Sequence, residues 1–362
     1  MSVAYIPNYF PAPVDEETAV QIDRLTVVFG PRPRRALPLL DAGASRIQLR
    51  EATGLTLGVH DCSLTIRRGE ILVLMGLSGS GKSTLLRSIN GLAPALRGEV
   101  RIRDGEGMTP VSATDPAALR RLRLKRVTMV FQHFGLLPWR SVAENVGLGL
   151  ELAGLKPAER RERVATQLDL VGLSPLAERR VGELSGGQQQ RVGLARAIAT
   201  EAPILLMDEP FSALDPLIRS RLQDELLELQ ARLKRTIVFV SHDLDEAFKI
   251  GDRIALLEEG RLVQCGSARE ILSAPATPHV AQFVAHANPL EALTARDAMR
   301  PGETASDGSL GSGRFADPDA TLGRVIPLFG GGVDHVEVRE HGRSIGVIRA
   351  EDVLAVLAGR GS

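Results

Sequence analysis

An apolar run, a glycine-rich loop and the start of a helix follow one another in residues 69–86, GEILVLMGLSGSGKSTLL. The apolar run, residues 71–75, predicts a strand that is buried on both faces. The loop after it matches the pattern GxxxxGK[ST], in which glycines let consecutive backbone N–H groups curl around phosphate oxygens. A helix that begins near Lys82 would present its positive end to the same anion. The stretch therefore predicts a phosphate-binding loop between a buried strand and a helix.

The loop residues have distinct expected roles in binding a nucleoside triphosphate. Lys82 would reach the β- and γ-phosphates and is one of three expected catalytic residues, and the Ser83 hydroxyl would bind Mg²⁺. The alternative, a merely structural glycine turn, does not explain why the strand, loop and helix signals agree. The residues of this stretch expected to contact the nucleotide are Gly76, Ser78, Gly79, Ser80, Gly81, Lys82, Ser83 and Thr84.

Length and composition are those of an ordinary globular protein. A chain of 362 residues, 44% hydrophobic and 24% charged, should hold more than one domain. Lys+Arg and Asp+Glu each number 44, so the basic surplus of a nucleic-acid-binding protein is missing and we expect no nucleic-acid partner. No apolar run approaches the roughly 18 residues of a membrane span, and no signal-peptide pattern is evident. We expect a cytoplasmic protein that can still dock on a membrane partner.

Strand and helix patterns alternate along the chain on both sides of the loop. Asp215 and Pro216 are a typical N-cap and first residue of a long helix between two predicted strands. Residues 134–184 instead predict short helices with polar connections. The pattern as a whole predicts an α/β fold with a mostly parallel sheet and a helical subdomain. The apolar runs that predict strands include residues 21–29, 127–131, 204–207 and 236–240.

Polar residues follow three of these predicted strands and would meet at one edge of the sheet. Asp208 is expected to help bind Mg²⁺, and Glu209 is expected to act as the general base on the attacking water. His242, the third expected catalytic residue, would contact the γ-phosphate and orient the water through Glu209. Gln132 would add a neutral ligand to Mg²⁺ or to the water. Alone, the two acids could be exposed residues at a strand end, and His242 could be a hydrogen-bonded loop histidine. Beside a phosphate loop, these residues together predict nucleotide hydrolysis.

A second anion-binding helix start is predicted where Ser185, Gly186, Gly187 and Gln188 precede a helix over residues 189–200. This element has no lysine, and the phosphate loop already has a helix of its own. A second phosphate-binding helix is hard to explain with one nucleotide and one chain. It is explained if two chains face each other and each supplies this element to the nucleotide of the other.

The motifs GLSGSGKST, LSGGQ, LLMDEP and SALD, in this order with Gln132 and His242, resemble the ATP-binding subunits of ABC transporters over roughly residues 21–285. The resemblance implies a head-to-tail dimer with two ATP molecules, each held between the Lys82 loop of one chain and Ser185 of the other.

Two further residues take roles from this resemblance. It implies that Asp215 in SALD communicates across the dimer. It also implies that an aromatic residue near the first strand stacks on adenine, and Phe29 fits that position. Roughly residues 30–56 separate Phe29 from the next predicted strand.

Three segments resemble one branch of this family, the importers of quaternary amines such as glycine betaine, proline betaine and choline. The segments are residues 35–64, 136–154 and 235–266. Such a protein is an ATPase with Mg²⁺ as cofactor, an integral membrane permease and an extracytoplasmic substrate-binding protein as partners, and a peripheral place on the cytoplasmic face of the plasma membrane. Residues 294–299 and 336–357 resemble the start and end of one CBS unit, a regulatory domain that these proteins often carry in tandem.

Four parts are therefore expected. They are a flexible lead-in over residues 1–20, the ABC ATP-binding domain over 21–285 with its helical subdomain at about 134–184, a linker over 286–320, and a small CBS-like α+β unit over 321–362.

Alternatives exist for one segment and for the function. The segment around Trp139 is either core of the helical subdomain or a dock for the permease, and we favour the dock. The alternative functions are an importer subunit for another small solute such as an amino acid, a soluble ABC-type mechanical ATPase in repair or translation, and a ligand-sensing tail with an ATPase attached. Mechanical ATPases usually carry two nucleotide domains or a long coiled-coil insert, and this sequence shows neither.

Overall fold

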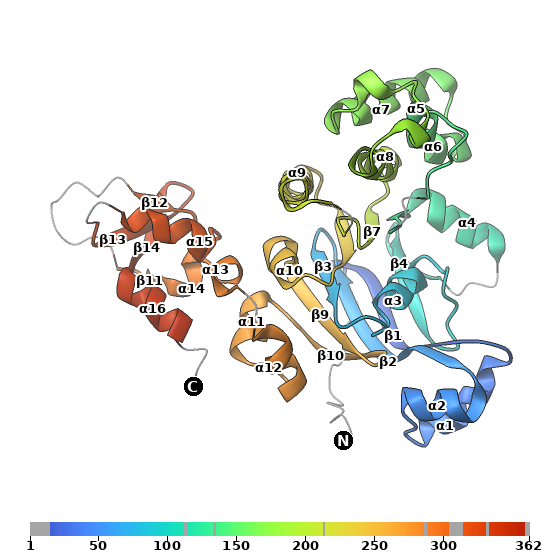
Figure 1. Cartoon of the computed structure of the whole chain (residues 1–362), viewed down its shortest axis with the longest axis horizontal. Coiled ribbons are helices and arrows are strands. Elements are labelled where there is room, and N and C mark those ends of the chain that lie inside the picture. Colours follow the sequence, from blue (N-terminus) through green and yellow to red (C-terminus); the bar gives the residue numbers. More distant parts are fainter. Residues whose placement is uncertain are drawn as a thin grey trace. The chain divides into compact units, whose positions relative to one another are not determined.

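The computed structural model describes residues 15–111, 115–132, 135–212, 214–285, 288–303, 314–330 and 333–358. The chain divides into two compact units (Figure 1). The first is formed by residues 1–242 and 255–263, and the second by residues 243–254 and 264–362. Among the described residues, no helix is both long and apolar enough to cross a membrane.

A parallel sheet at the centre of the first unit carries the phosphate loop. Its strand order is β10-β9-β3-β8-β7-β6, and β3, β8, β7 and β6 run parallel to one another. All residues of β3, β7 and β8 are buried, as their continuous apolar runs predict. The carboxyl ends of these strands therefore meet at one edge of the sheet. The strands are β3 (Ile71–Met75), β6 (Val127–Val130), β7 (Ile204–Asp208), β8 (Thr236–Val240), β9 (Arg253–Glu258) and β10 (Arg261–Gly266).

An antiparallel sheet accompanies the parallel one, with the strand order β2-β1-β4-β5. Its strands are β1 (Thr18–Phe29), β2 (Thr56–Arg67), β4 (Arg97–Asp104) and β5 (Gly107–Pro110). Helices α3 (Lys82–Ile89) and α4 (Pro116–Lys125) of the first unit contact strands of the two sheets, and α9 (Pro216–Leu233) connects β7 to β8. The side chain of Asp215 caps α9 and Pro216 is its first residue, as the sequence predicts.

A segment between β1 and β2 folds into short helices that are attached to the antiparallel sheet. Its elements are a 3₁₀ turn (Pro33–Ala36), α1 (Leu37–Asp41) and α2 (Arg46–Thr53). Ser45 and Gln48 form a capping box that fixes the start of α2. Buried side chains of the helices pack on those of the strands: Val28, Ala36, Leu40, Leu49, Leu55 and Leu57.

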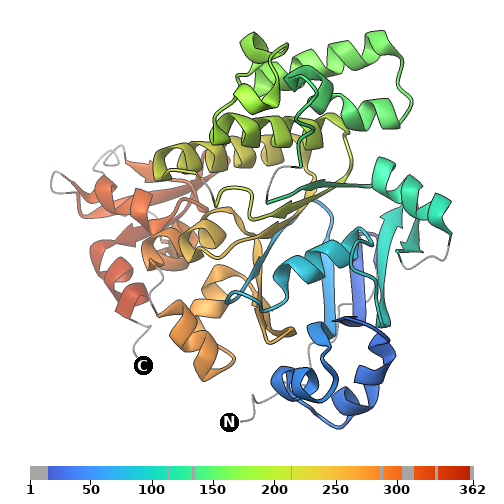
Figure 2. The ribbon, with the colours of Figure 1, turned by 45° about the vertical axis from the view of Figure 1, so that its right-hand side comes forward.

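The helical subdomain packs around α8 (Gly186–Ala199), and both views show α5, α6 and α7 beside that helix (Figures 1 and 2). Val192, Ala195 and Ala199 of α8 belong to the same buried cluster as side chains of the shorter helices. The shorter elements are α5 (Val142–Val146), α6 (Leu148–Leu152), α7 (Pro157–Leu170) and the 3₁₀ turns Ser174–Leu176 and Val181–Glu183.

The second unit has a sheet of its own, with the order β11-β14-β13-β12. Its core includes Leu293, Ala295 and Ala298, so part of the segment expected to be a linker packs with the tail. The first helices of the unit are α10 (Leu244–Ile250), α11 (Ala268–Ser273), α12 (Pro278–Val284), α13 (Pro289–Ala292) and α14 (Ala295–Ala298). The rest comprises β11 (Arg300–Pro301), β12 (Phe315–Ala316), α15 (Leu322–Val325), a 3₁₀ turn (Ile326–Phe329), β13 (His335–Glu340), β14 (Arg343–Arg349) and α16 (Ala350–Ala358).

Candidate nucleotide-binding site

The loop between β3 and α3 has a backbone that only glycine can adopt at two positions. Gly76 has φ of 139°, and a Cβ there would lie 2.1 Å from the carbonyl oxygen of Leu257. Gly81 has φ of 104°, and its Cβ would lie 2.4 Å from the carbonyl oxygen of Gly58. Any side chain at these positions would displace backbone, which explains both glycines of the motif.

Two polar side chains of the loop are buried and turned toward it. The Lys82 ammonium donates to the carbonyl oxygens of Gly76, at 2.8 Å, and Leu77, at 3.1 Å. Burial lowers the pKa of Lys82, and the nearby Glu209 and Asp208 carboxylates oppose that shift. The buried Ser80 hydroxyl has no hydrogen-bond partner among the described residues. A buried cation and an unpaired donor in a loop of this shape suit an anion.

Asp208, at the end of β7, is fully buried and held by α3. The Ser83 hydroxyl donates to Oδ1 of Asp208 at 2.8 Å. Arg87, one turn further along the same helix, places Nη2 3.0 Å from Oδ2. The structure thus joins two residues expected to bind Mg²⁺ and adds an arginine that the sequence did not single out.

Glu209 lies where the other two candidate residues converge. Its Oε2 accepts a hydrogen bond from the Gln132 amide nitrogen at 3.2 Å and lies 3.6 Å from Nδ1 of His242. Glu209 has φ of 48°, a left-handed conformation that is uncommon outside glycine. The carboxylate is largely buried, whereas His242 is mostly exposed. Three side chains from the ends of three strands therefore meet at one point, as the motif positions predict.

The second predicted anion-binding element starts its helix earlier than expected. Helix α8 begins at Gly186 rather than at residue 189, because Ser185 is the N-cap. The Ser185 hydroxyl accepts from the Gln188 N–H at 3.4 Å, and the Ser185 N–H donates to the Gln188 side chain at 2.9 Å. A Cβ on Gly186 would meet nothing within 4 Å. Among the described residues, no hydrogen bond or ion pair joins this element to the phosphate loop.

Phe29 lies at the end of β1 and is 43% exposed. A Cβ on Gly58 would lie 2.9 Å from the Phe29 ring and 2.8 Å from the Thr84 methyl group. The absence of a side chain at Gly58 therefore leaves room for the Phe29 ring beside Thr84, in the first turn of α3. Asp215 is exposed and accepts from the Ile218 N–H at 3.0 Å as the cap of α9.

The sequence did not single out Arg46, which reaches the phosphate loop from α2. Its Nη1 donates to the carbonyl oxygen of Gly79. Beside it lies a cavity of about 820 Å³ that is also lined by His60 and Arg261. Burial, with a smaller effect of the Arg261 charge, lowers the pKa of His60 to about 4. The signal that could have found Arg46 is the capping pattern Ser45–Gln48, which places Arg46 in the first turn of a helix.

Residues 59–212 match the family model described as ABC transporter. The chain is 50% identical over 281 residues to a glycine betaine/proline betaine transport system ATP-binding protein of Escherichia coli, covering 78% of this chain and 69% of that protein. It is 42% identical over 331 residues to a trimethylamine N-oxide transport system ATP-binding protein of Ruegeria pomeroyi, covering 91% and 94%.

A solved structure is also similar: the dimeric, post-hydrolysis state of the ATP-binding cassette MJ0796 bound to ADP and Pi. It has a TM-score of 0.58 and 31% identity, and the match covers 68% of this chain and 97% of that one. These matches agree with the motif order and the α/β fold class predicted from the sequence. The chain therefore belongs to the family of ABC-transporter ATP-binding proteins, together with those of glycine betaine/proline betaine transport systems.

Proposed function

We propose that this chain is the ATP-hydrolysing subunit that powers import of a quaternary ammonium compound through a membrane permease. The observation that carries the proposal is the convergence of Gln132 and His242 on Glu209, beside the buried Lys82 loop. This arrangement places a general base that can activate water next to a loop that can bind phosphate. The family to which the chain belongs uses ATP to drive transport.

The catalytic roles follow from this geometry. Lys82 binds the β- and γ-phosphates, helped by the loop N–H groups and the Ser80 hydroxyl. Glu209 takes a proton from the attacking water as it adds to the γ-phosphate, while the bond from the γ-phosphate to the bridging oxygen breaks and ADP leaves. Gln132 and His242 hold the Glu209 carboxylate in place, and His242 also faces the γ-phosphate.

The donors present fit Mg²⁺. The oxygens of Ser83 and Asp208 lie 2.8 Å apart, and hard oxygen donors are the ligands that Mg²⁺ prefers. We propose Ser83, Asp208 and Gln132 as the residues that hold it. When bound with ATP, the ion neutralises charge on the β- and γ-phosphate oxygens.

We propose that a second copy of the chain completes the site. The start of α8 presents Ser185 and Gly186 to open space, and the helix end favours an anion. No hydrogen bond or ion pair links it to the phosphate loop within the part of the chain that the structure describes. Gly187 and Gln188 belong to the same element. Asp215, exposed at the start of α9, is proposed to contact the second copy, and Phe29 to stack on adenine.

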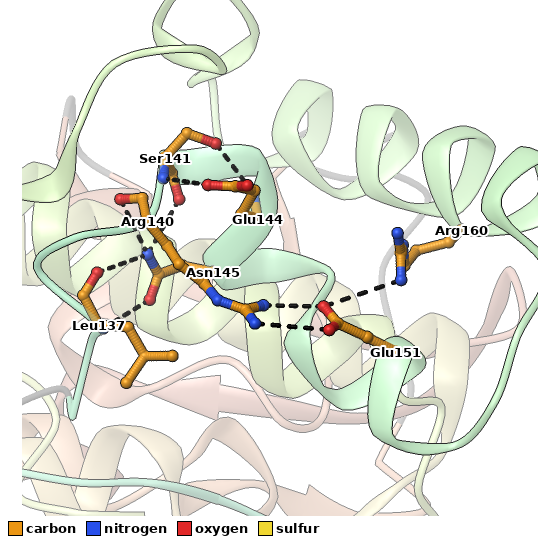
Figure 3. Close-up of polar contacts among 7 residues, drawn as sticks. All are labelled: Leu137, Arg140, Ser141, Glu144, Asn145, Glu151 and Arg160. Carbon is orange, nitrogen blue, oxygen red and sulfur yellow. Dashed lines mark hydrogen bonds and ion pairs between the residues drawn. The ribbon is translucent and has the colours of Figure 1, made fainter.

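The proposed dock for the permease is the exposed turn around Trp139, which is 67% exposed. The side chain of Asn145 is hydrogen-bonded to this turn, as Figure 3 shows. The Asn145 side chain donates to the carbonyl oxygens of Leu137, at 3.1 Å, and Ser141, at 2.9 Å, and accepts from the Leu137 N–H at 2.7 Å. A large exposed aromatic side chain on such a turn is the kind of anchor that protein interfaces use.

An ion-pair network forms one wall of the surface next to Trp139. Glu151 lies 2.8 Å from Arg140 and 3.8 Å from Arg160 (Figure 3). These residues and Trp139 line a cavity of about 760 Å³. We propose that a cytoplasmic segment of the permease inserts here, so that the chain lies peripherally on the cytoplasmic side of the membrane.

The relatives support two related substrate classes. The glycine betaine/proline betaine relative is 50% identical, which supports a quaternary amine such as glycine betaine, proline betaine or choline. The trimethylamine N-oxide relative matches 91% of this chain and supports that amine oxide as the second candidate. An extracytoplasmic substrate-binding protein would select between them. We also propose a CBS-like regulatory unit at residues 321–362, and its boundary moves into the expected linker because Leu293, Ala295 and Ala298 pack in the same core.

Reconstitution of the complete transporter tests the proposal. The chain is co-purified with its permease and binding protein, placed in vesicles, and assayed for ATP-dependent uptake of labelled glycine betaine, choline, trimethylamine N-oxide and a control amino acid. We expect uptake of a methylated amine that stops when Lys82 is replaced by Ala. Uptake of the amino acid alone, or none that depends on ATP, would contradict the proposed substrate.

A further inference from the structure

The edge of the parallel sheet opposite the nucleotide site carries a cavity of about 510 Å³ that is rich in positive charge. The turns that lead into β6, β7, β8 and β3 all line it, through Arg126, Pro203, Lys234–Arg235 and Arg68–Gly69. Arg103 adds a further cation from the neighbouring antiparallel sheet. Its charged lining residues are five cations, Arg68, Arg103, Arg126, Lys234 and Arg235, and one acid, Glu201.

The turns around this cavity are hydrogen-bonded to one another, so the backbone that carries the cations is held in place. The Gln230 side chain, 9% exposed, donates to the carbonyl oxygens of Gly69, at 2.7 Å, and Arg235, at 2.5 Å. The Gly69 N–H donates to the Thr236 hydroxyl at 3.0 Å. The Thr236 N–H in turn donates to the carbonyl oxygen of Pro203 at 3.0 Å. A site of this kind needs little reorganisation to bind a ligand.

Most of the positive charge in the cavity is not neutralised by carboxylates. Arg126 pairs with Asp104 at 2.6 Å. Arg103 donates to the carbonyl oxygens of Thr18, at 2.9 Å, and Glu106, at 3.0 Å, which fix its guanidinium without cancelling its charge.

Arg235, Arg68 and Lys234 are likewise without a carboxylate partner in an ion pair among the described residues. Arg235 donates to the carbonyl oxygen of Ile198 at 3.3 Å. Glu201 already pairs with Arg163, at 3.0 Å. Among the described residues, no side-chain hydrogen bond or ion pair engages Arg68 or Lys234.

We propose that this cavity binds an anion that carries two or more phosphate charges. Arginine can bind phosphate through two parallel hydrogen bonds. The cavity combines three arginines that are hydrogen-bonded to the protein, Arg103, Arg126 and Arg235, with Arg68 and Lys234, and this charge suits a ligand with several phosphate charges. Burial lowers the pKa of Arg235, so an anion would also relieve the cost of keeping that cation away from water. A volume of this size suits a small molecule.

Calorimetric titration of the full chain with inorganic pyrophosphate, in excess ADP so that the nucleotide site is filled, tests the proposal. The cavity variant is Arg68→Gln/Lys234→Gln. The control, Arg50→Gln/Arg232→Gln, removes the same charge from exposed residues outside the cavity. At about 0.15 M salt we expect the wild type and the control to bind alike, and the cavity variant to bind about tenfold or more weakly. Unchanged basal ATP hydrolysis in both variants shows that they fold.

A second arm identifies the source of the phosphate. Wild type and variants are mixed with vesicles of cardiolipin, whose headgroup carries two phosphates, in phosphatidylcholine and then floated. Pyrophosphate binding without flotation supports a free anion, and flotation that only the cavity variant loses supports a lipid headgroup. Equal loss in the cavity variant and the control, or no binding in either arm, would overturn the proposal.

Discussion

Two residues of one helix, Ser83 and Arg87, hold the buried carboxylate of Asp208 by its two oxygens. A fully buried carboxylate is costly unless it is paired, and Arg87 supplies the compensating charge. Oδ1 is thereby kept beside the Ser83 hydroxyl. Glu209, the next residue, is turned by its left-handed backbone toward different partners, Gln132 and His242. Asp208 and Glu209 are thus neighbours in the sequence but contact different partners in the structure.

Replacing Glu209 by Gln tests its task as a base. The amide keeps the size of the side chain but cannot take the proton of the attacking water, so we expect hydrolysis to slow by roughly 10²–10⁴-fold. ATP binding should be unchanged, as measured by nucleotide titration. Glu228→Gln, at an exposed position on α9, is the control. Turnover near that of the control would remove Glu209 from the role.

His60 gives the stability a pH dependence. Its pKa is about 4 in the folded chain against a usual value of 6.5, so the unfolded chain takes up a proton that the folded chain refuses. Stability is full above pH 6.5 and falls as the pH drops toward 4. Between pH 7.5 and pH 5 the loss is roughly 2 kcal/mol.

Urea unfolding at these two pH values checks the contribution of His60. In His60→Gln the difference in unfolding free energy between pH 7.5 and pH 5 should shrink by about that amount. The same difference in variant and wild type would show that His60 does not titrate as described.

At the scale of elements, the sequence predicts β3, β7, β8 and the capped start of α9, because their local signals are strong. The sequence does not predict helix α2, because prolines and arginines interrupt the helical pattern just before it and the helix buries a single side chain, Leu49. The sequence predicts the start of α8 three residues too late, because Gly186 and Gly187 have low helix propensity. Arg87 and Arg46 escaped notice because their partners, Asp208 and Gly79, lie far away in the sequence.

Helix α2 is expected to support the phosphate loop, and Leu49→Ala tests this. Leu49 is fully buried between the helix and the strands, so its truncation should cost about 2–5 kcal/mol of packing. Because α2 carries Arg46 to the carbonyl oxygen of Gly79, ATP affinity should fall as well. Arg50→Ala, at an exposed position of the same helix, should change neither thermal stability nor affinity. Lower stability with unchanged affinity would separate α2 from the nucleotide site.

The turn at Trp139 is expected to act only when the permease is present. Trp139→Ala should leave the stability and basal ATP hydrolysis of the isolated chain unchanged and lower permease-stimulated hydrolysis about tenfold or more, as the loss of an interface anchor does. Leu152→Ala, another exposed apolar residue of the helical subdomain, is the matched control. An equal effect of both substitutions, or none at Trp139, would place the dock elsewhere.

At the scale of the whole molecule, we propose that the first unit holds only part of a nucleotide site. The loop, Asp208, Glu209 and His242 gather at one sheet edge, while no hydrogen bond or ion pair between described residues joins the start of α8 to them. The sequence predicts such a division because two phosphate-binding helix starts exceed the needs of one nucleotide, and the division stays a prediction. Closure of the site by a second chain would turn ATP binding into motion between two chains, which is what a transporter requires.

Sedimentation of the Glu209→Gln chain with MgATP tests this account most directly, because blocked hydrolysis should trap the closed state. We expect a dimer with MgATP and a monomer without it. Adding Ser185→Arg puts bulk and charge into the second anion site and should leave a monomer with MgATP, although titration still shows ATP bound to the Lys82 loop. A stable ATP-bound dimer of the double variant would contradict the claim that Ser185 of a second chain completes the site.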